Sequence, residues 1–186
     1  MKSGILRKSL HFLPFITALH CCICATGVYF GFSKNIGGFV FQGASQINLD
    51  VKGRLAVPVK HRDGLSTPAG GKLVLTAHPD KCLLLYPQVT WEPIRDRVMK
   101  FPAMNKTASV WKRMLIGFAE EITVDNAGRI LVSPELRAFA GIEKQIMFVG
   151  QGSHFEVWSL NAWNEQLSAL TSGAAGLPPG TEDFSL

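Results

Sequence analysis

Two stretches of the chain, 75 positions apart, repeat one pattern: Ile47-Asn-Leu-Asp50-Val-Lys-Gly53-Arg54-Leu-Ala-Val-Pro58 and Ile122-Thr-Val-Asp125-Asn-Ala-Gly128-Arg129-Ile-Leu-Val-Ser133. Each copy has a second arginine eight residues beyond the first, Arg62 or Arg137. Self-similarity at a fixed offset is the signature of a duplicated structural unit. The sequence therefore predicts two copies of one small module instead of one asymmetric domain.

Each copy is predicted to form a hairpin, a short helix and a second hairpin. In the first copy, residues 45–50 alternate apolar and polar side chains, residues 51–54 form a turn, and residues 55–57 resume as a strand. In the second copy, Ser133-Pro134-Glu135 supplies a helix N-cap, a proline at the first helical position and an acid in the first turn, and Gly141 ends the helix. The second hairpins pair residues 72–77 with 81–86, and residues 145–150 with 154–158.

Two connecting helices are predicted between the copies, at residues 91–99 and 105–118. The second helix places Val110, Met114 and residues 116–118 on its apolar side. Short strands mixed with short helices indicate an α/β fold of the α+β type. Residues 168–186 are rich in Gly, Ala, Pro and Ser, which predicts a disordered tail.

The formal charge of +5 is concentrated in the first 39 residues, which contain four basic residues and no acid. The rest of the chain has 19 − 4 = 15 basic and 14 acidic residues, a net charge of +1. The overall charge is therefore no argument for nucleic-acid binding, and only the local placement of arginine and lysine can support it. Three of the four cysteines also lie in residues 1–39, so the repeats contain only Cys82. One cysteine excludes a disulfide framework there and fits a reducing cytoplasm.

Residues 1–39 allow two interpretations. Residues 10–32 have no formal charge and follow Arg7 and Lys8, which is typical of a membrane anchor. Alternatively, residues 1–39 are upstream sequence and translation starts at Val40, where a GTG codon would be read as methionine.

Four segments resemble the MraZ family of bacterial transcriptional regulators: Phe41–Arg54, Thr76–Pro87, Asp125–Val132 and Val149–Trp158. The resemblance implies two tandem AbrB-like (SpoVT-AbrB) swapped-hairpin modules that form one pseudo-twofold, β-barrel-like domain with short helices. Module 1 would span residues 41–90, the connecting helices 91–118, and module 2 residues 119–167.

The resemblance also implies a function. Proteins of this family form rings and bind short direct repeats of double-stranded DNA in the promoter of their own division and cell-wall gene cluster. We therefore expect a cytoplasmic, nucleoid-associated repressor that forms a homo-oligomer. Chains of the family begin at the Phe-x-Gly stretch, which agrees with a start at Val40.

The Asp-x-x-x-Arg turns are the candidate DNA-binding site. Arg54 and Arg129 at the turn tips could contact guanine edges or phosphates. Glycine at the preceding positions, Gly53 and Gly128, permits backbone conformations that are closed to other residues. The aspartates, Asp50 and Asp125, are expected to order the turns, because a carboxylate would be repelled by phosphates.

Three further basic residues are candidates for phosphate contact: Lys52, Lys60 and Arg62. The second copy has Ala127 and Ser133 in place of Lys52 and Pro58, so equal DNA contact by both modules is left open. The simpler alternative is that each arginine only pairs with its own aspartate on the surface.

Other motifs give weaker signals. Gly150-Gln-Gly152 lacks the third glycine and the following helix of a dinucleotide site. Cys82 with His78 could be imagined as a nucleophile and base, but Cys82 lies in an apolar run. We expect no enzyme activity, small-molecule substrate, cofactor or metal. The main rival function is a membrane-anchored interaction protein, in which case residues 1–39 would contact a membrane.

Overall fold

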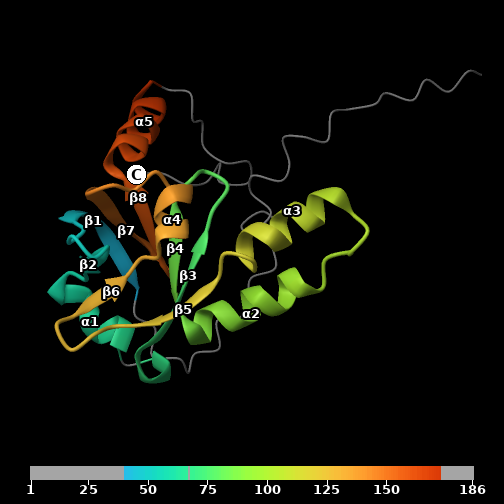
Figure 1. The fold of residues 1–186 in the computed structure, drawn as a ribbon, viewed down its shortest axis with the longest axis horizontal. Coiled ribbons are helices and arrows are strands. Elements are labelled where there is room, and N and C mark those ends of the chain that lie inside the picture. The colour runs from blue at the N-terminus through green and yellow to red at the C-terminus, as the bar shows by residue number, and fades with distance from the viewer. Residues whose placement is uncertain (1–39, 67, 173–186) are drawn as a thin grey trace, which may run out of the picture. The chain divides into compact units, whose positions relative to one another are not determined.

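The computed structural model describes residues 40–66 and 68–172 of the 186-residue chain (Figure 1). The predictions for residues 1–39 and 173–186 lie outside the described residues. Within the described ranges, no helix has the length and apolar character needed to cross a membrane.

Apart from a short 3-10 helix in the first copy, the two copies correspond element by element. The first contains β1 (Phe41–Asn48), β2 (Arg54–Ala56), α1 (Val59–Ser66), a short 3-10 helix η1 (Pro68–Gly71), β3 (Lys72–Ala77), β4 (Leu83–Pro87) and α2 (Gln88–Met99). The second contains β5 (Glu120–Thr123), β6 (Arg129–Leu131), α4 (Pro134–Phe139), β7 (Gln145–Gly152), β8 (Phe155–Ser159) and α5 (Leu160–Thr171). Helix α3 (Lys106–Leu115) joins the copies, whereas the helix predicted at residues 91–99 corresponds to α2, which begins at Gln88 directly after β4.

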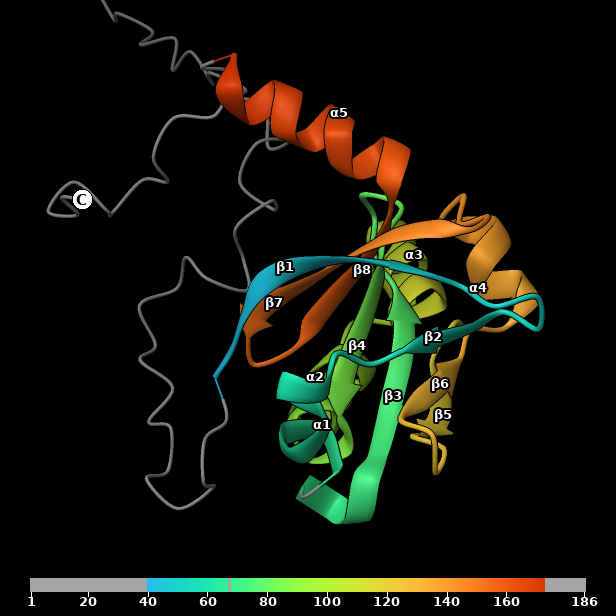
Figure 2. The ribbon, with the colours of Figure 1, turned by 90° about the vertical axis from the view of Figure 1, so that its left-hand side faces the viewer.

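The strands form two antiparallel sheets, and both contain strands from each copy. The larger sheet has the order β1-β7-β8-β4-β3-β5. Strand β1 pairs with β7 of the other copy, and β5 pairs with β3. The central contact is β4 with β8, which relates the copies by a pseudo-twofold arrangement. Figure 2 shows β1 running alongside β7 across the top of the sheet.

Strands β2 and β6 form the second sheet, which we call the β2–β6 ribbon. The local prediction of a hairpin within each signature is thus wrong for strand pairing, although the turn is present. Directly after β1, Leu49 forms an isolated bridge with Leu55 of β2, and no extended ladder joins β1 to β2. The first two strands of each copy diverge and find partners in the other copy, which is the swapped-hairpin arrangement.

The larger sheet is open, with β1 and β5 at its edges. It does not close into a barrel, so the β-barrel-like part of the prediction needs correction. The mixed α/β fold and the tandem modules are confirmed.

Each face of the sheet supports its own core. On one face, Leu73, Leu75 and Phe155 pack with residues of the β2–β6 ribbon and of α1 and α4. On the other face, Val74, Leu84 and further residues pack under α2 and α3. Helices α2 and α3 accordingly lie on the opposite side of the sheet from α1 and the ribbon (Figure 1). Strands buried on both faces read as continuous apolar runs, which explains Leu83–Tyr86.

Several helix predictions are confirmed and others need correction. Ser133 caps α4 by accepting a hydrogen bond from the Leu136 amide (3.4 Å). In α3 the buried residues are Ala108 and Leu115, whereas Val110 is 46% exposed, so the predicted apolar side is rotated from the actual one. Residues 168–171, expected to begin the disordered tail, form the last turn of α5.

Candidate nucleic-acid interface

Asp50 orders the turn of module 1 and fixes Arg54. Its Oδ1 accepts hydrogen bonds from the backbone amides of Lys52 and Arg54, both at 2.9 Å. Its Oδ2 accepts one from Nε of Arg54 at 2.7 Å, and Nη2 lies 2.7 Å from the same oxygen. These contacts, led by the bond from the Arg54 amide, lower the pKa of Asp50. The carboxylate is therefore ionised at neutral pH and serves the turn.

Module 2 repeats this geometry. Oδ1 of Asp125 accepts from the amides of Ala127 (2.9 Å) and Arg129 (2.8 Å). Its Oδ2 lies 2.9 Å from Nε and 2.8 Å from Nη2 of Arg129. The side-chain bond between them lowers the pKa of Asp125 and raises the pKa of Arg129. Both aspartates accept hydrogen bonds from amides of their own turn, and each arginine has its aspartate as a partner.

The β2–β6 ribbon places both arginines on one face. Arg54 is opposite Leu131, and Ala56 is opposite Arg129. Directly opposed residues of a sheet point to the same face, so all four side chains share one face of the ribbon. The intervening pair, Leu55 and Ile130, points the other way into the core. Asp50 also contributes to the raised pKa of Arg129, so the two turns are electrostatic neighbours.

Each guanidinium retains hydrogen-bond donors beyond its aspartate. The side chains of Arg54 and Arg129 are 29% and 34% exposed. Asp50 and Asp125 engage the Nε side, which leaves Nη1 and the second hydrogen of Nη2 outside these pairs. The arginines are thus held at one edge and can donate from the other.

The turn glycines are needed for conformation and for space. Gly53 and Gly128 have φ angles of 78° and 74°, in the left-handed region that favours glycine. Both glycines are buried. Their Cα atoms lie against the guanidinium groups of Arg137 and Arg62, respectively.

The predicted phosphate contacts differ in their surroundings. Lys52 and Lys60 are exposed, on the module 1 turn and on α1. Arg62 is half-buried, and its Nε donates to the Val57 carbonyl at 2.9 Å. This inward-facing bond was not predicted from the sequence, although the recurrence of Arg62 as Arg137 in the other copy was a signal for it.

The two modules differ in charge around their turns. Residues 40–66 contain four basic and two acidic residues, a net charge of +2. The equivalent residues 115–141 contain two basic and four acidic residues, a net charge of −2. Module 2 has Ala127 for Lys52 and Glu135 for Lys60, and it adds Glu120 and Glu121 on β5. The duplicated backbone therefore presents a basic turn and an acidic turn.

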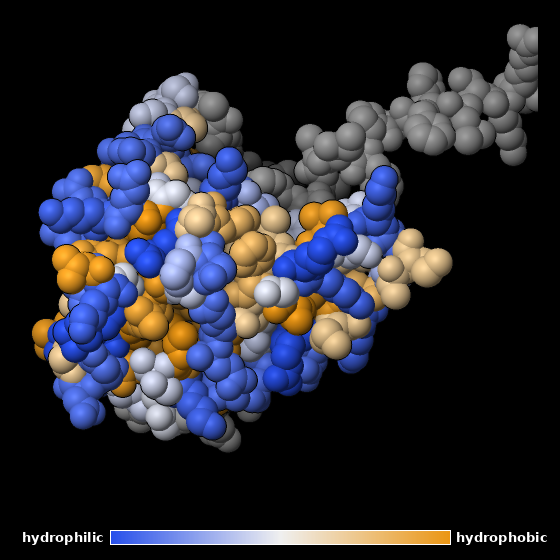
Figure 3. Space-filling view, in the orientation of Figure 1, coloured by the Kyte–Doolittle hydropathy of each residue, from blue (hydrophilic) through white to orange (hydrophobic). Residues whose placement is uncertain are grey.

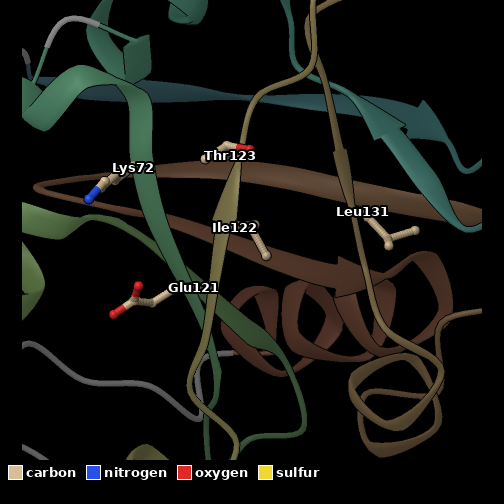
Figure 4. A pocket seen from close by; sticks show the side chains of 5 residues that line it. All are labelled: Lys72, Glu121, Ile122, Thr123 and Leu131. Carbon is tan, nitrogen blue, oxygen red and sulfur yellow. The ribbon is translucent and has the colours of Figure 1, made fainter.

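Three further observations on the described residues concern a surface hollow, metal binding and Cys82. A surface hollow of about 390 Å³ is lined by Lys72, Glu121, Ile122, Thr123 and Leu131. Figure 4 shows these side chains spread along neighbouring strands, without a common point of convergence. No group of three or more His, Cys, Asp or Glu side chains in the described ranges is arranged to bind a metal ion. Cys82 is fully buried, and burial raises the pKa of its thiol, so it is a poor nucleophile.

The fold and the turns define a class: a duplicated swapped-hairpin protein with one Asp–Arg turn per module. The model of the family described as "MraZ protein" matches residues 40–114 and 115–175, one match for each module. The chain is 55% identical over 148 residues to the transcriptional regulator MraZ of Methylobacillus flagellatus, and 51% identical to that of an Azoarcus species. It is 43% identical to the one from Nitrosomonas europaea. Each comparison covers 79% of this chain and the whole of the relative. The chain belongs to the MraZ family, and the names of its relatives support a role as a transcriptional regulator.

Proposed function

We propose that the protein is a sequence-specific DNA-binding repressor of its own division and cell-wall gene cluster, and that its two Asp–Arg turns contact direct repeats in the promoter. The observation that carries this proposal is the placement of Arg54 and Arg129 on one face of the β2–β6 ribbon. The major groove of B-DNA admits a two-stranded ribbon. A ribbon with two fixed guanidinium groups on its outer face suits that groove.

In this proposal the aspartates prepare the arginines for base recognition. Because Asp50 fixes the Nε edge of Arg54, little side-chain freedom is lost when the opposite edge binds. That edge can donate two hydrogen bonds to O6 and N7 of a guanine. Arg129 with Asp125 would act in the same way.

The charge difference supports unequal shares for the two modules. Lys52 and Lys60 give module 1 additional phosphate contacts. In module 2 the position of Lys60 is occupied by Glu135, whose negative charge repels phosphate. We therefore assign the larger part of the DNA affinity to the module 1 turn. Unequal halves would also give the bound protein a direction, which suits direct repeats better than inverted ones.

Self-association into a ring is part of the proposal, because one chain has too little positive charge for tight binding. Helix α2 packs with α3, and its Trp91 and Val98 are buried. The equivalent helix α5 has no buried residue, and Leu167 and Leu170 are 40% and 56% exposed. The α2–α3 pair has exposed Met99, Met104 and Val110, and apolar atoms are visible at its outer end in Figure 3. These surfaces are candidates for contact between subunits in the cytoplasm, at the nucleoid.

The test of ring formation is sedimentation of the full chain beside a Leu167→Ser, Leu170→Ser variant. We expect the variant to form smaller species at equal concentration. Unchanged sedimentation would exclude α5 from the subunit contact.

The test of DNA binding is fluorescence anisotropy with DNA from upstream of the gene, at two salt concentrations. We expect salt-sensitive binding that depends on the direct repeats. Arg54→Ala should weaken it by about 10- to 100-fold, as expected for loss of a bidentate base contact, and Arg129→Ala should weaken it less. Arg113→Ala, which removes an exposed arginine of α3, is the control for lost charge. Equal affinity for the promoter and for random duplex would refute the proposal.

A further inference from the structure

Arg62 and Arg137 occupy equivalent positions in α1 and α4, and each side chain reaches the turn of the other module. A Cβ atom added to Gly128 would overlap Cζ and Nε of Arg62. A Cβ atom added to Gly53 would lie 3.0 Å from both Cζ and Nε of Arg137. Each guanidinium therefore rests on the glycine that precedes the arginine of the opposite module.

Backbone hydrogen bonds join the same groups. The Val57 amide donates to the Gly128 carbonyl at 2.9 Å, and the Val57 carbonyl accepts from Nε of Arg62 at 2.9 Å. In the other half, the Val132 amide donates to the Gly53 carbonyl at 3.0 Å. Nε of Arg137 is buried and has no hydrogen-bond partner among the described residues. The two halves thus share the cross-module contact but differ in how well the arginine is bonded.

We infer that Arg62 and Arg137 are positioning residues, each of which holds the turn of the opposite module and so sets the presentation of Arg129 or Arg54. A planar guanidinium covers a peptide group closely, and only glycine leaves room for it there. Arg137 of the acidic module thus holds the turn of the basic module, and Arg62 of the basic module holds the turn of the acidic module. The consequence for DNA binding rests on the proposed function, whereas the effect on the turns does not.

The competing hypothesis is direct phosphate contact by Arg62. A phosphate contact changes the salt dependence of binding, because each neutralised phosphate releases counterions and contributes about 0.9 to the slope of log K against log salt. A positioning residue leaves that slope unchanged. The hypotheses also rank the two arginines differently. Direct phosphate contact predicts that loss of Arg62, in the basic module, reduces DNA affinity more. Positioning predicts that loss of Arg137 reduces it more, because Arg137 holds the turn of the basic module.

The first experiment does not involve DNA. Hydrogen–deuterium exchange of the full chain is followed by mass spectrometry in peptides that cover residues 50–55 and 125–130. Arg62→Gln should speed exchange in the module 2 peptide about ten-fold, because the guanidinium that packs on Gly128 is lost, and should leave the module 1 peptide unchanged. Arg137→Gln should do the reverse. Arg113→Gln is the control, and thermal unfolding verifies that every variant folds.

The second experiment measures DNA affinity in double-mutant cycles. Arg62→Gln should add nothing to Arg129→Ala, because both act on one turn, but should add fully to Arg54→Ala. Arg62→Lys keeps the charge and loses the planar guanidinium, so it should behave like Arg62→Gln. Arg137→Gln should weaken binding more than Arg62→Gln, with no change in the salt slope.

Three results would overturn the inference. These are faster exchange in the turn of the same module or in neither turn, a salt slope that falls by about one in Arg62→Gln, and full rescue of DNA binding by Arg62→Lys. If the wild-type chain shows no preference for promoter DNA, the proposed function fails, and the exchange experiment alone decides the role of the two arginines.

Discussion

Oδ2 of Asp50 lies 2.7 Å from both Nε and Nη2 of Arg54, while Oδ1 of the same carboxylate accepts the Lys52 and Arg54 amides. One acid thus orders the backbone of the turn and the side chain at its tip. An ion pair that is about 30% exposed adds little stability by itself. The main effect of the pair is to fix the position of the Arg54 guanidinium.

Asp50→Ala should separate specific from non-specific DNA binding. The variant loses the acceptor that fixes Arg54, so affinity for the promoter should fall by about ten-fold. It also removes a negative charge, so affinity for random duplex should rise at low salt. Anisotropy with both duplexes provides the measurement, and Asp125→Ala is the matched change in module 2. Parallel changes on both duplexes would mean that Asp50 has no role in specificity.

Exchange of the charges on α1 and α4 should redistribute affinity between the modules. Lys60→Glu gives module 1 the acid of module 2, and Glu135→Lys gives module 2 the lysine of module 1. We expect the first change to reduce DNA affinity and the second to increase it, with salt slopes that fall and rise by about one. The double exchange keeps the net charge of the chain and is the control. Equal affinity of all three variants would show that these positions do not face DNA.

Gly128→Ala should destabilise the protein more than a glycine substitution with a similar φ and free space. Gly141 has a φ of 59° and no atom within 4 Å of an added Cβ, so Gly141→Ala meets only the backbone penalty of about 1 kcal/mol. Gly128→Ala must also displace Arg62, which raises the expected cost to about 2–4 kcal/mol. Urea unfolding of the two variants gives the comparison. Equal costs would show that Arg62 moves aside freely.

His154 should make the protein acid-sensitive between about pH 6.5 and pH 4. Its ring stacks on Tyr86 at 4.5 Å between centroids, and burial, with a smaller contribution from His78, lowers its pKa to about 4. The unfolded chain takes up the proton first, so the free energy of unfolding is constant above pH 6.5 and falls as the pH drops, by at most about 3 kcal/mol. Unfolding titrations measure this loss.

His154→Phe is the control for the pH dependence, because it keeps a ring against Tyr86 and removes the titrating group. The loss of stability should shrink but not vanish, since burial also lowers the pKa of His61. The turn aspartates, Asp50 and Asp125, affect a different pH range. Their pKa values are lowered, so their contribution to the free energy of unfolding is lost only below about pH 4. An unchanged pH profile in His154→Phe would contradict the assignment.

Local features of the fold were predictable from the sequence because they depend on local chemistry. The Asp–Gly–Arg turn, the Ser133 cap and the second hairpins have side chains that act within a few residues of their own position. The exchange of β1 and β5 was not predictable from spacing, because a strand has the same alternation whichever strand it pairs with. It followed only from the family resemblance.

The candidate site was predictable in part, for a similar reason. Arg54 and Arg129 could be singled out by their recurrence, but the face that they share is set by the β2–β6 register. The contact of Arg62 with Gly128 could not be predicted from helix α1, because it depends on the approach of the other module. The buried face of α3 could not be predicted from its own sequence, because it is set by contact with α2 and the sheet.

The strand exchange has a consequence for synthesis of the protein. Strand β1 begins at residue 41, but its partner β7 ends at residue 152, so more than one hundred residues must leave the ribosome before the pair can form. The first module therefore cannot complete its strand pairs during translation of its own half. We therefore expect the amino-terminal half to remain partly folded until β7 has been synthesised. The whole domain should then fold in one late step, as is typical of pairings between distant segments.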